Sequence, residues 1–177
     1  MTFKFGKNFD EMCYPFMYEQ SMLCDFEVIT DELCGHIGAM ISHLPEDMPD
    51  IAADLEQIQP LAFHVNGSIR GRLAIAETDI QWLQGRLDHY RAEVAGRLEQ
   101  FVLPRGMPPV PQLHLARSAC KKAIRIMVRL DQEEGKEIDM VLPRICNMLC
   151  NFFFVLTLVI NQRRGLVEPE FVSRSYG

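Results

Sequence analysis

Residues 101–130 read FVLPRGMPPVPQLHLARSACKKAIRIMVRL, a proline-rich turn followed by a long amphipathic stretch. The prolines between positions 104 and 111 fix the backbone and remove hydrogen-bond donors, so no helix can run through them. Beyond them apolar residues recur at helical spacing. They are Leu113, Ala116, Cys120, Ala123, Ile124 and Met127. The stretch therefore predicts a turn and then a helix over residues 112–134, which ends at Gly135.

Outside this stretch, the same helical spacing of apolar residues occurs in segments that Pro and Gly separate. We expect helices at residues 25–44, 50–69, 77–101 and 139–163. No alternating pattern typical of a β-strand competes with them. Five helices with mostly short connectors predict an all-α fold, a five-helix antiparallel bundle, over residues 25–177. Residues 1–24 are expected to form an N-terminal arm.

The bulk composition narrows the class of protein. The chain has 177 residues and a net charge of −6, which argues against a nucleic-acid partner. Residues 141–161 are long enough to cross a membrane but are interrupted by polar side chains, so we expect a buried core helix and no membrane span. No secretory leader is recognisable. These features predict a cytoplasmic protein.

The six cysteines show no spacing typical of a zinc site, and no metal site is predicted from them. Without a secretory leader, reduced thiols in the cytoplasm fit best. Cys146 and Cys150 would share one helix face. Two small core side chains are the simpler interpretation of this pair, and a metal or corrinoid contact is the alternative.

A row of cations marks the helix after the proline-rich turn: Arg117, Lys121, Arg125 and Arg129. Residues four apart lie on the same side of a helix, so these side chains repel one another unless something negative lies opposite. One interpretation is a solvated surface with Glu133 and Glu134 nearby. The other is a cradle for a polyphosphate, in which Lys and Arg neutralise several oxygens at once.

Two further features bear on this choice. TDEL, residues 30–33, places two acids in an apolar helix. Thr30 could cap the helix with the acids in its first turn, or Asp31 could pair with a basic residue of the fourth helix and orient it. In the last helix Asn147 and Asn151 stand among apolar residues, where a buried amide needs a partner. That partner is either another helix or the polar edge of a ligand.

These features occur together and in order in the PduO-type ATP:cob(I)alamin adenosyltransferases, which this chain resembles over about residues 25–170. That family has a Phe-Ile/Val-Leu-Pro-Gly-Gly loop before a helix reading Leu-His-x-Ala-Arg-x-x-Cys-Arg-Arg-Ala-Glu-Arg. Here the loop is FVLPRG and the helix is LHLARSACKKAIR. TDEL stands for the family's Val-Asp-Glu-Leu. CNMLCNFFFVL, residues 146–156, resembles its Leu-Asn-Arg-Leu-Ser-Asp-x-Leu-Phe-Val-Leu, and NQRRGLVEPEF resembles its ending.

The resemblance implies a five-helix bundle of the cobalamin adenosyltransferase type, assembled as a homotrimer with the active site between subunits. It implies transfer of the adenosyl group of ATP to cob(I)alamin with Mg²⁺, and a corrinoid-dependent enzyme as a possible recipient. The consecutive Phe152, Phe153 and Phe154 point about 100° apart, so one core would not receive all three equally, and one ring should meet another helix or another subunit.

Carried over by position, Lys121 and Arg125 take the places of the family's phosphate-binding arginines. Asp31 takes the place of the aspartate that pairs with the first of them. Phe101 stands for the loop aromatic that keeps the lower face of the cobalt free of a ligand. Asn147 stands for an asparagine that touches the corrin.

The chain departs from the family on the ATP side. KFGKNFDEM, residues 4–12, stands where the family has a Thr-Gly-Asp-x-Gly-x-Thr loop, and only Lys4 and Gly6 match. Ile124 replaces a glutamate, and on the last helix Met148 and Asn151 replace the family's arginine and aspartate. The alternative function is therefore a non-catalytic corrinoid-binding relative, which acts as a carrier, chaperone or sensor. A helical scaffold whose basic row meets an acidic partner is a third interpretation.

Overall fold

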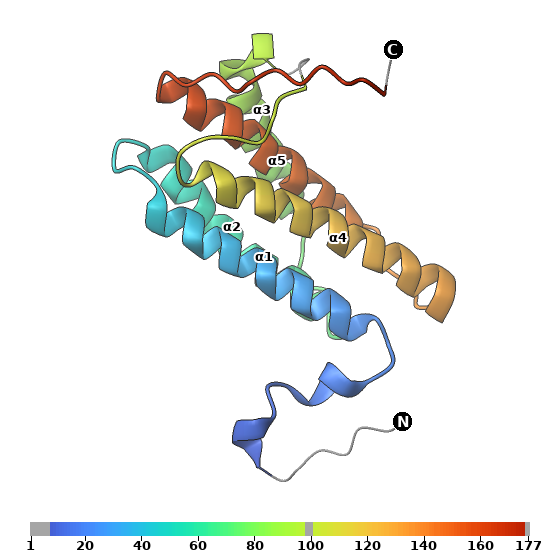
Figure 1. Ribbon diagram of the computed structural model, residues 1–177. Coiled ribbons are helices and arrows are strands. Elements are labelled where there is room, and N and C mark those ends of the chain that lie inside the picture. The colour runs from blue at the N-terminus through green and yellow to red at the C-terminus, as the bar shows by residue number, and fades with distance from the viewer. Residues whose placement is uncertain (1–7, 98–100, 176–177) are drawn as a thin grey trace.

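The computed structural model describes residues 8–97 and 101–175 of the chain. In these ranges five α-helices follow one another in alternating directions (Figure 1). They are α1 (Leu23–His43), α2 (Pro49–Ser68), α3 (Glu77–Glu93), α4 (Val110–Glu134) and α5 (Val141–Arg163). The described ranges hold no strand beyond an isolated bridge between Val102 and Glu170. The predicted all-α five-helix bundle is confirmed.

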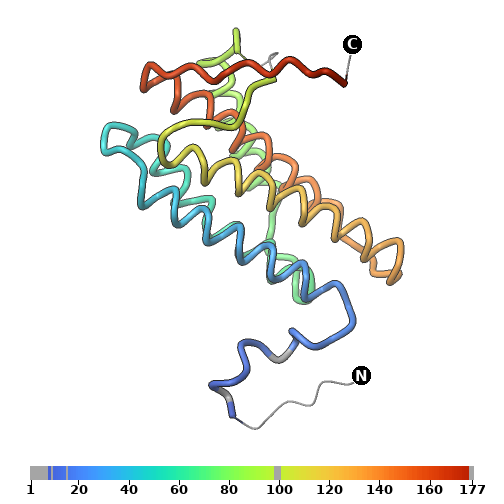
Figure 2. Tube along the Cα trace, in the orientation of Figure 1, coloured from blue at the N-terminus to red at the C-terminus, as the bar shows by residue number. Residues whose placement is uncertain are grey.

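Helix α4 packs against both α1 and α5, α2 packs against α1, and α3 packs against α5 (Figures 1 and 2). Because successive helices reverse direction, α3 and α5 run the same way. Their ion pairs show this. Glu77 and Arg144 join the two beginnings with oxygen–nitrogen distances of 2.8 and 2.9 Å. Glu93 and Arg163 join the two ends at 2.9 Å.

The ends of α4 follow from the sequence. Pro111 lies in the first turn, where its missing N–H is not needed by the helix. Gly135 ends the helix with a φ of 64°, a left-handed conformation that glycine adopts without a Cβ clash. Its N–H donates to the carbonyl of Leu130. Between the ends, the apolar stripe predicted from the sequence is buried, except for a half-buried Ile124.

Helix α5 is the most buried helix of the bundle. It is long and apolar enough to cross a membrane by length and composition, but 67% of its most apolar window is buried inside the protein, as expected of a core helix. Phe152 and Phe153 are fully buried, and the half-buried Phe154 packs against Arg117. One of the three rings was expected to meet another helix or another subunit, and Phe154 meets another helix, α4, through Arg117.

The third helix is shorter than its periodicity predicts. It ends at Glu93, not at Phe101, and a short 3₁₀ turn over Ala95–Arg97 follows. Gly96 disfavours a continued helix by about 1 kcal/mol relative to alanine. The turn also lets Arg97 reach the carbonyl of Leu158 at 3.3 Å on α5. A contact with a distant segment therefore sets this helix end.

Replacing Phe153 by alanine should lower the free energy of unfolding by about 3–5 kcal/mol, because it leaves a cavity between packed helices. Phe63→Ala is the matched control, since the side chain of Phe63 is 53% exposed. Urea denaturation followed by circular dichroism measures both. Equal losses in the two variants would contradict the assigned core.

Candidate functional site

A groove of about 670 Å³ runs between α1 and α4 and is bordered by the N-terminal arm. One wall is cationic and comes from successive turns of α4. Its members are Lys121, Lys122, Arg125 and Arg129. The other wall carries two carboxylates, those of Glu19 and Asp25, among apolar side chains of α1. More cations than anions border the groove, so it favours an anionic ligand.

The two ends of the basic row are already engaged. The guanidinium of Arg117 lies 4.7 Å from the ring centre of Phe154, outside the groove. Arg129 donates to both carboxylate oxygens of Glu133 at 2.9 and 3.1 Å, one helical turn away. The charged groups of Arg117 and Arg129 therefore both have partners within the chain. The interpretation as a solvated, internally paired surface therefore fits Arg129 in part.

The middle of the row is different. Lys121 and Arg125 are both exposed, and neither forms a hydrogen bond or ion pair with any residue in the described ranges. Each has a full set of donors turned toward the groove wall. These are the two side chains that the sequence nominated for phosphate binding. The geometry leaves them free to bind an anion.

The structure of the TDEL segment, residues 30–33, shows neither a helix cap at Thr30 nor an ion pair of Asp31 with α4 within the described ranges. The side chain of Thr30 donates to the carbonyl of Phe26 at 2.8 Å inside α1, so Thr30 does not cap a helix that begins at Leu23. Asp31 is exposed and forms no ion pair within the described part of the chain. Glu32 is the acid that reaches α4, where its carboxylate lies 3.8 Å from Lys122. The pairing of Asp31 with Lys121 stays a prediction for an assembled protein.

The N-terminal arm is fixed to the bundle beside the groove. Arg70 forms ion pairs with Glu19 of the arm and with Glu27 of α1. Its guanidinium also lies 4.6 Å from the ring centre of Phe16. Charge-assisted contacts of this kind hold the arm as one wall of the groove. Sequence reasoning missed Arg70 because its partners are far away in the chain.

Two of the nominated arm residues, Lys4 and Gly6, lie outside the described residues. Downstream of them, Glu134 at the end of α4 accepts hydrogen bonds from the hydroxyl of Ser21 at 2.6 Å and the N–H of Met22 at 2.7 Å. This contact supplies the beginning of α1 with an acceptor. The division into an arm over residues 1–24 and a bundle over 25–177 stays a prediction.

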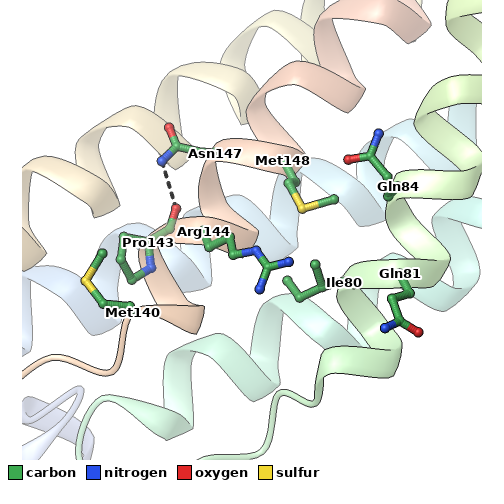
Figure 3. A pocket seen from close by; sticks show the side chains of 8 residues that line it. All are labelled: Ile80, Gln81, Gln84, Met140, Pro143, Arg144, Asn147 and Met148. Atoms are coloured by element: carbon green, nitrogen blue, oxygen red, sulfur yellow. Dashed lines mark hydrogen bonds between the residues drawn. The ribbon is translucent and has the colours of Figure 1, made fainter.

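A second groove, of about 680 Å³, lies between α3 and the first turns of α5 (Figure 3). It is lined by apolar and amide side chains, and Arg144 is its only charged lining residue among those described. Asn147 borders it, and its amide donates to the carbonyl of Pro143 at 3.0 Å. Asn151 is exposed and has no hydrogen bond within the described ranges. Within residues 8–97 and 101–175, neither amide therefore forms a hydrogen bond with another helix.

Phe101 stands at the other end of the bundle. Its side chain is 81% exposed, in the loop that leads to α4. The carbonyl of the nearby Arg105 accepts a hydrogen bond from Asn161 at 3.0 Å, near the end of α5. Asn147 lies about four helical turns earlier on α5, roughly 20 Å away at 1.5 Å per residue. Asn147 and the loop of Phe101 therefore lie at opposite ends of α5.

His114 lies near the loop of Phe101 and is half-buried, and its Nε2 has no partner in the described ranges. Burial lowers the pKa of His114, and the neighbouring positive charge of Arg117 lowers it further, while Glu168 opposes the shift. The imidazole is therefore neutral in the folded protein. His114 lies beside the loop of Phe101, and no sequence pattern marked it as part of a site.

All six cysteines are unpaired. Burial raises the pKa of Cys146 to about 12 and also raises that of Cys120, so both stay thiols at neutral pH. Within residues 8–97 and 101–175, no three His, Cys, Asp or Glu side chains are grouped so as to hold a metal ion. Cys146 and Cys150 are buried, in agreement with the interpretation as core side chains.

The sequence matches a known family over most of its length. The profile of the family described as cobalamin adenosyltransferase matches residues 23–160. The chain is 32% identical over 148 residues to a corrinoid adenosyltransferase of Bacillus subtilis, which covers 80% of this chain and 75% of that protein. It is 34% identical over 137 residues to a cobalamin adenosyltransferase of Cupriavidus metallidurans. That match covers 76% of this chain and 72% of that protein.

Solved structures with the same fold come from Lactobacillus reuteri. One is a variant of a PduO-type ATP:corrinoid adenosyltransferase in which a histidine replaces a phenylalanine, complexed with cobalamin and ATP. It has a TM-score of 0.75 and 23% identity, and the match covers 89% of this chain and 87% of that chain. An arginine-to-lysine variant of the enzyme complexed with ATP has a TM-score of 0.76 and 24% identity. That match covers 89% of this chain and 90% of that chain. These similarities establish the fold.

The depressed pKa of His114 makes stability depend on pH in one direction. The unfolded chain takes up the proton near pH 6.5, while the folded imidazole resists it. The contribution of His114 to stability is therefore complete above about pH 6.5 and is lost as the pH falls below that value. His114→Gln should reduce this loss between about pH 7.5 and about pH 5.5 in urea titrations. The exposed His64→Gln is the control and should keep the wild-type dependence.

Proposed function

Because the chain belongs to the cobalamin adenosyltransferase family, we propose that it transfers the adenosyl group of ATP to the cobalt of a reduced corrinoid. The observation that carries this proposal is the pair of unengaged cations, Lys121 and Arg125, in the groove between α1 and α4. By the resemblance of the sequence motif, they take the places of the family's phosphate-binding arginines. A triphosphate is the anion that such a row suits, because it offers several oxygens along one line.

The reaction needs little covalent chemistry from the protein. The electron pair of Co(I) attacks the 5′-carbon of the ribose and forms the cobalt–carbon bond. The bond between that carbon and the phosphate oxygen breaks, and triphosphate leaves with the electron pair. The protein's part is to align the two substrates and to stabilise the charge on the leaving group. Lys121 and Arg125 are the residues that would do the latter.

Mg²⁺ fits the same groove as a partner of the triphosphate. Mg²⁺ in such sites binds through one or two carboxylates together with substrate phosphates. Asp25 is the available carboxylate, since it lines the groove and forms no ion pair or hydrogen bond within the described ranges. Glu19 is less suited, because Arg70 already binds it. When bound, Mg²⁺ would neutralise part of the charge that the triphosphate carries.

Phe101 is the residue proposed to act on the corrinoid. Its exposed ring can occupy the space beneath the corrin that water or the lower base would otherwise take. Cobalt without a lower ligand is easier to reduce to the nucleophilic Co(I) state. Asn147 and Asn151 are proposed to contact the corrin edge with their exposed amides.

A homotrimer with the active site between subunits is part of the proposal. Support comes from the separation of Phe101 and Asn147 along the bundle, since a second copy could bring both to one corrinoid. It also comes from Asp31, whose exposed carboxylate has no partner within the described ranges and could meet Lys121 of another copy. Light scattering should give a mass near three chains at micromolar concentration. A clean monomer would contradict the assembly.

We further propose a cytoplasmic location, which six unpaired cysteines support. The adenosylated corrinoid would then pass to a corrinoid-dependent enzyme as recipient.

The transfer itself is tested by mixing the protein with chemically reduced cobalamin and ATP and following the absorbance of adenosylcobalamin. We expect enzyme-dependent product that requires ATP and Mg²⁺. Cobalamin binding without any transfer would instead establish the alternative, a non-catalytic corrinoid-binding relative. If the protein neither binds cobalamin nor transfers the adenosyl group, the interpretation as a helical scaffold is the one that remains.

Arg125→Ala should weaken ATP binding by about 1.5–3 kcal/mol, the range for a hydrogen bond to a charged group. Arg129→Ala is the matched control on the same helix and should matter less, because Glu133 already engages Arg129. Calorimetric titration with ATP measures both. If the two variants bind as wild type does, the row is a solvated surface.

Phe101→Ala should slow transfer more than it weakens corrinoid binding, because it admits a lower ligand to Co(II). The absorbance spectrum of cob(II)alamin with ATP should lose its four-coordinate signal. An unchanged spectrum would show that Phe101 does not shield the cobalt. The exposed Phe63→Ala serves as the control for a lost aromatic side chain.

A further inference from the structure

The loop that carries Phe101 is bonded to the C-terminal segment that follows α5. The N–H of Leu103 donates to the carbonyl of Pro169 at 2.8 Å, and the N–H of Phe171 donates to the carbonyl of Phe101 at 2.7 Å. Together they form the isolated antiparallel bridge. In Figure 1 the segment crosses the end of the bundle over this loop. The backbone of Phe101 is therefore held from the C-terminal side.

A buried polar cluster lies under this bridge. Glu168 is 6% exposed and Asn161 is 1% exposed. The amide of Asn161 donates to the carboxylate of Glu168 at 2.8 Å and to the carbonyl of Arg105 at 3.0 Å. The guanidinium of Arg97 pairs with the other oxygen of the same carboxylate. We call Arg97, Asn161 and Glu168 the C-terminal clamp.

The clamp joins four separate parts of the chain. Arg97 belongs to the turn after α3, Asn161 to α5, Glu168 to the C-terminal segment, and Arg105 to the loop. A buried carboxylate is costly unless it is paired and hydrogen-bonded. Loss of Glu168 would leave Arg97 without its ion pair and the amide of Asn161 with only the carbonyl of Arg105. Removal of this one carboxylate therefore weakens the contacts of both side chains.

The loop also packs closely against Asn161 of the clamp at Gly106. A Cβ at Gly106 would lie 2.6 Å from the side-chain oxygen of Asn161 and 2.6 Å from a methyl of Val110. Only glycine permits this close approach. The backbone beside Phe101 is thus packed against Asn161 as well as hydrogen-bonded to it.

Phe101 itself contributes little to its own position. With 81% of its side chain exposed, it has few contacts that could fix its place. Its direction must come from the backbone, and the backbone is held by the bridge and the clamp. An exposed group that acts on a ligand has to be held by rigid surroundings, because misplacement of about 1 Å is costly in rate.

We propose that Glu168 is a positioning residue for Phe101, through which the C-terminal clamp sets the aromatic ring beneath the corrin. This inference rests on the proposed adenosyl transfer. Glu168 does not touch the reacting atoms. It acts by holding the C-terminal segment, which in turn holds the loop at residues 101 and 103. The clamp therefore belongs to the proposed corrinoid side of the site and shares no residue with the groove of Lys121 and Arg125.

The first test needs no corrinoid. Glu168→Ala should speed amide hydrogen exchange at Leu103 and Phe171 by at least about tenfold, because local opening exposes both amides. Glu168→Gln keeps an acceptor for Asn161 while losing the charge for Arg97, so its exchange rates should lie between. Glu170→Ala is the matched control, since this exposed neighbour joins the bridge by its backbone alone. Wild-type exchange in Glu168→Ala would overturn the clamp.

The second test separates positioning from simple stabilisation. Glu168→Ala should reduce the four-coordinate cob(II)alamin signal and lower kcat severalfold, while the KM for ATP stays within about twofold. In a Phe101→Ala background the same change should have no further effect on the signal or on kcat, because Glu168 acts through Phe101. Additive losses in the double variant, or a parallel rise in the KM for ATP, would overturn the proposal.

The two proposals fail in different ways. A wild-type protein that neither transfers adenosyl nor yields a four-coordinate signal would overturn the proposed function. Faster exchange at Leu103 and Phe171 in Glu168→Ala would, in that case, still support the hold of Glu168 on the loop. Wild-type protein that transfers normally, together with a Glu168→Ala variant that keeps the full spectral signal, would overturn the positioning role alone.

Discussion

The packing of α4 between α1 and α5 is the constraint on which the rest of this structure depends. One helix must cover two neighbours at once, so its inner side carries small residues, among them Ala116, Ala119 and Ala123, which are buried. Small side chains let helices approach closely, and the larger residues of α1 and α5 fill the space. With its inner side committed in this way, α4 can place its cations only on the remaining side.

That remaining side divides its cations by their surroundings. Arg117 lies where Phe154 of α5 offers an aromatic surface, and Arg129 lies one turn from Glu133 on its own helix. Lys121 and Arg125 lie between them, facing the groove beside α1, and have no partner in the described part of the chain. A regular row in the sequence thus becomes two engaged charges and two available ones. The difference is what turns a charged surface into a candidate phosphate site.

The bundle keeps its two proposed substrate contacts at different ends. The groove of Lys121 and Arg125 lies along α1 and α4, whereas the loop that leads to α4 lies at the other end of α4 (Figure 1). Helices are rigid over this distance, so a single chain cannot bring the two together by a small adjustment. The proposed active site between copies of the chain would resolve this geometry. It would also explain the C-terminal clamp, since an exposed ring that acts on a ligand needs a fixed base.

By itself the sequence determined the helices, the bundle class, the family resemblance and the identity of Lys121 and Arg125 as the notable cations. Periodicity, proline and glycine are local signals, and they act on the backbone nearest to them. Tertiary structure alone decided that Asp25 lines the groove while Asp31 does not, that Asn147 and Asn151 face outward, and that α3 ends at Glu93. It also decided that Glu168 is buried against Arg97 and Asn161. Those outcomes depend on partners far apart in the chain, and no local pattern records which distant side chain a folded segment will meet.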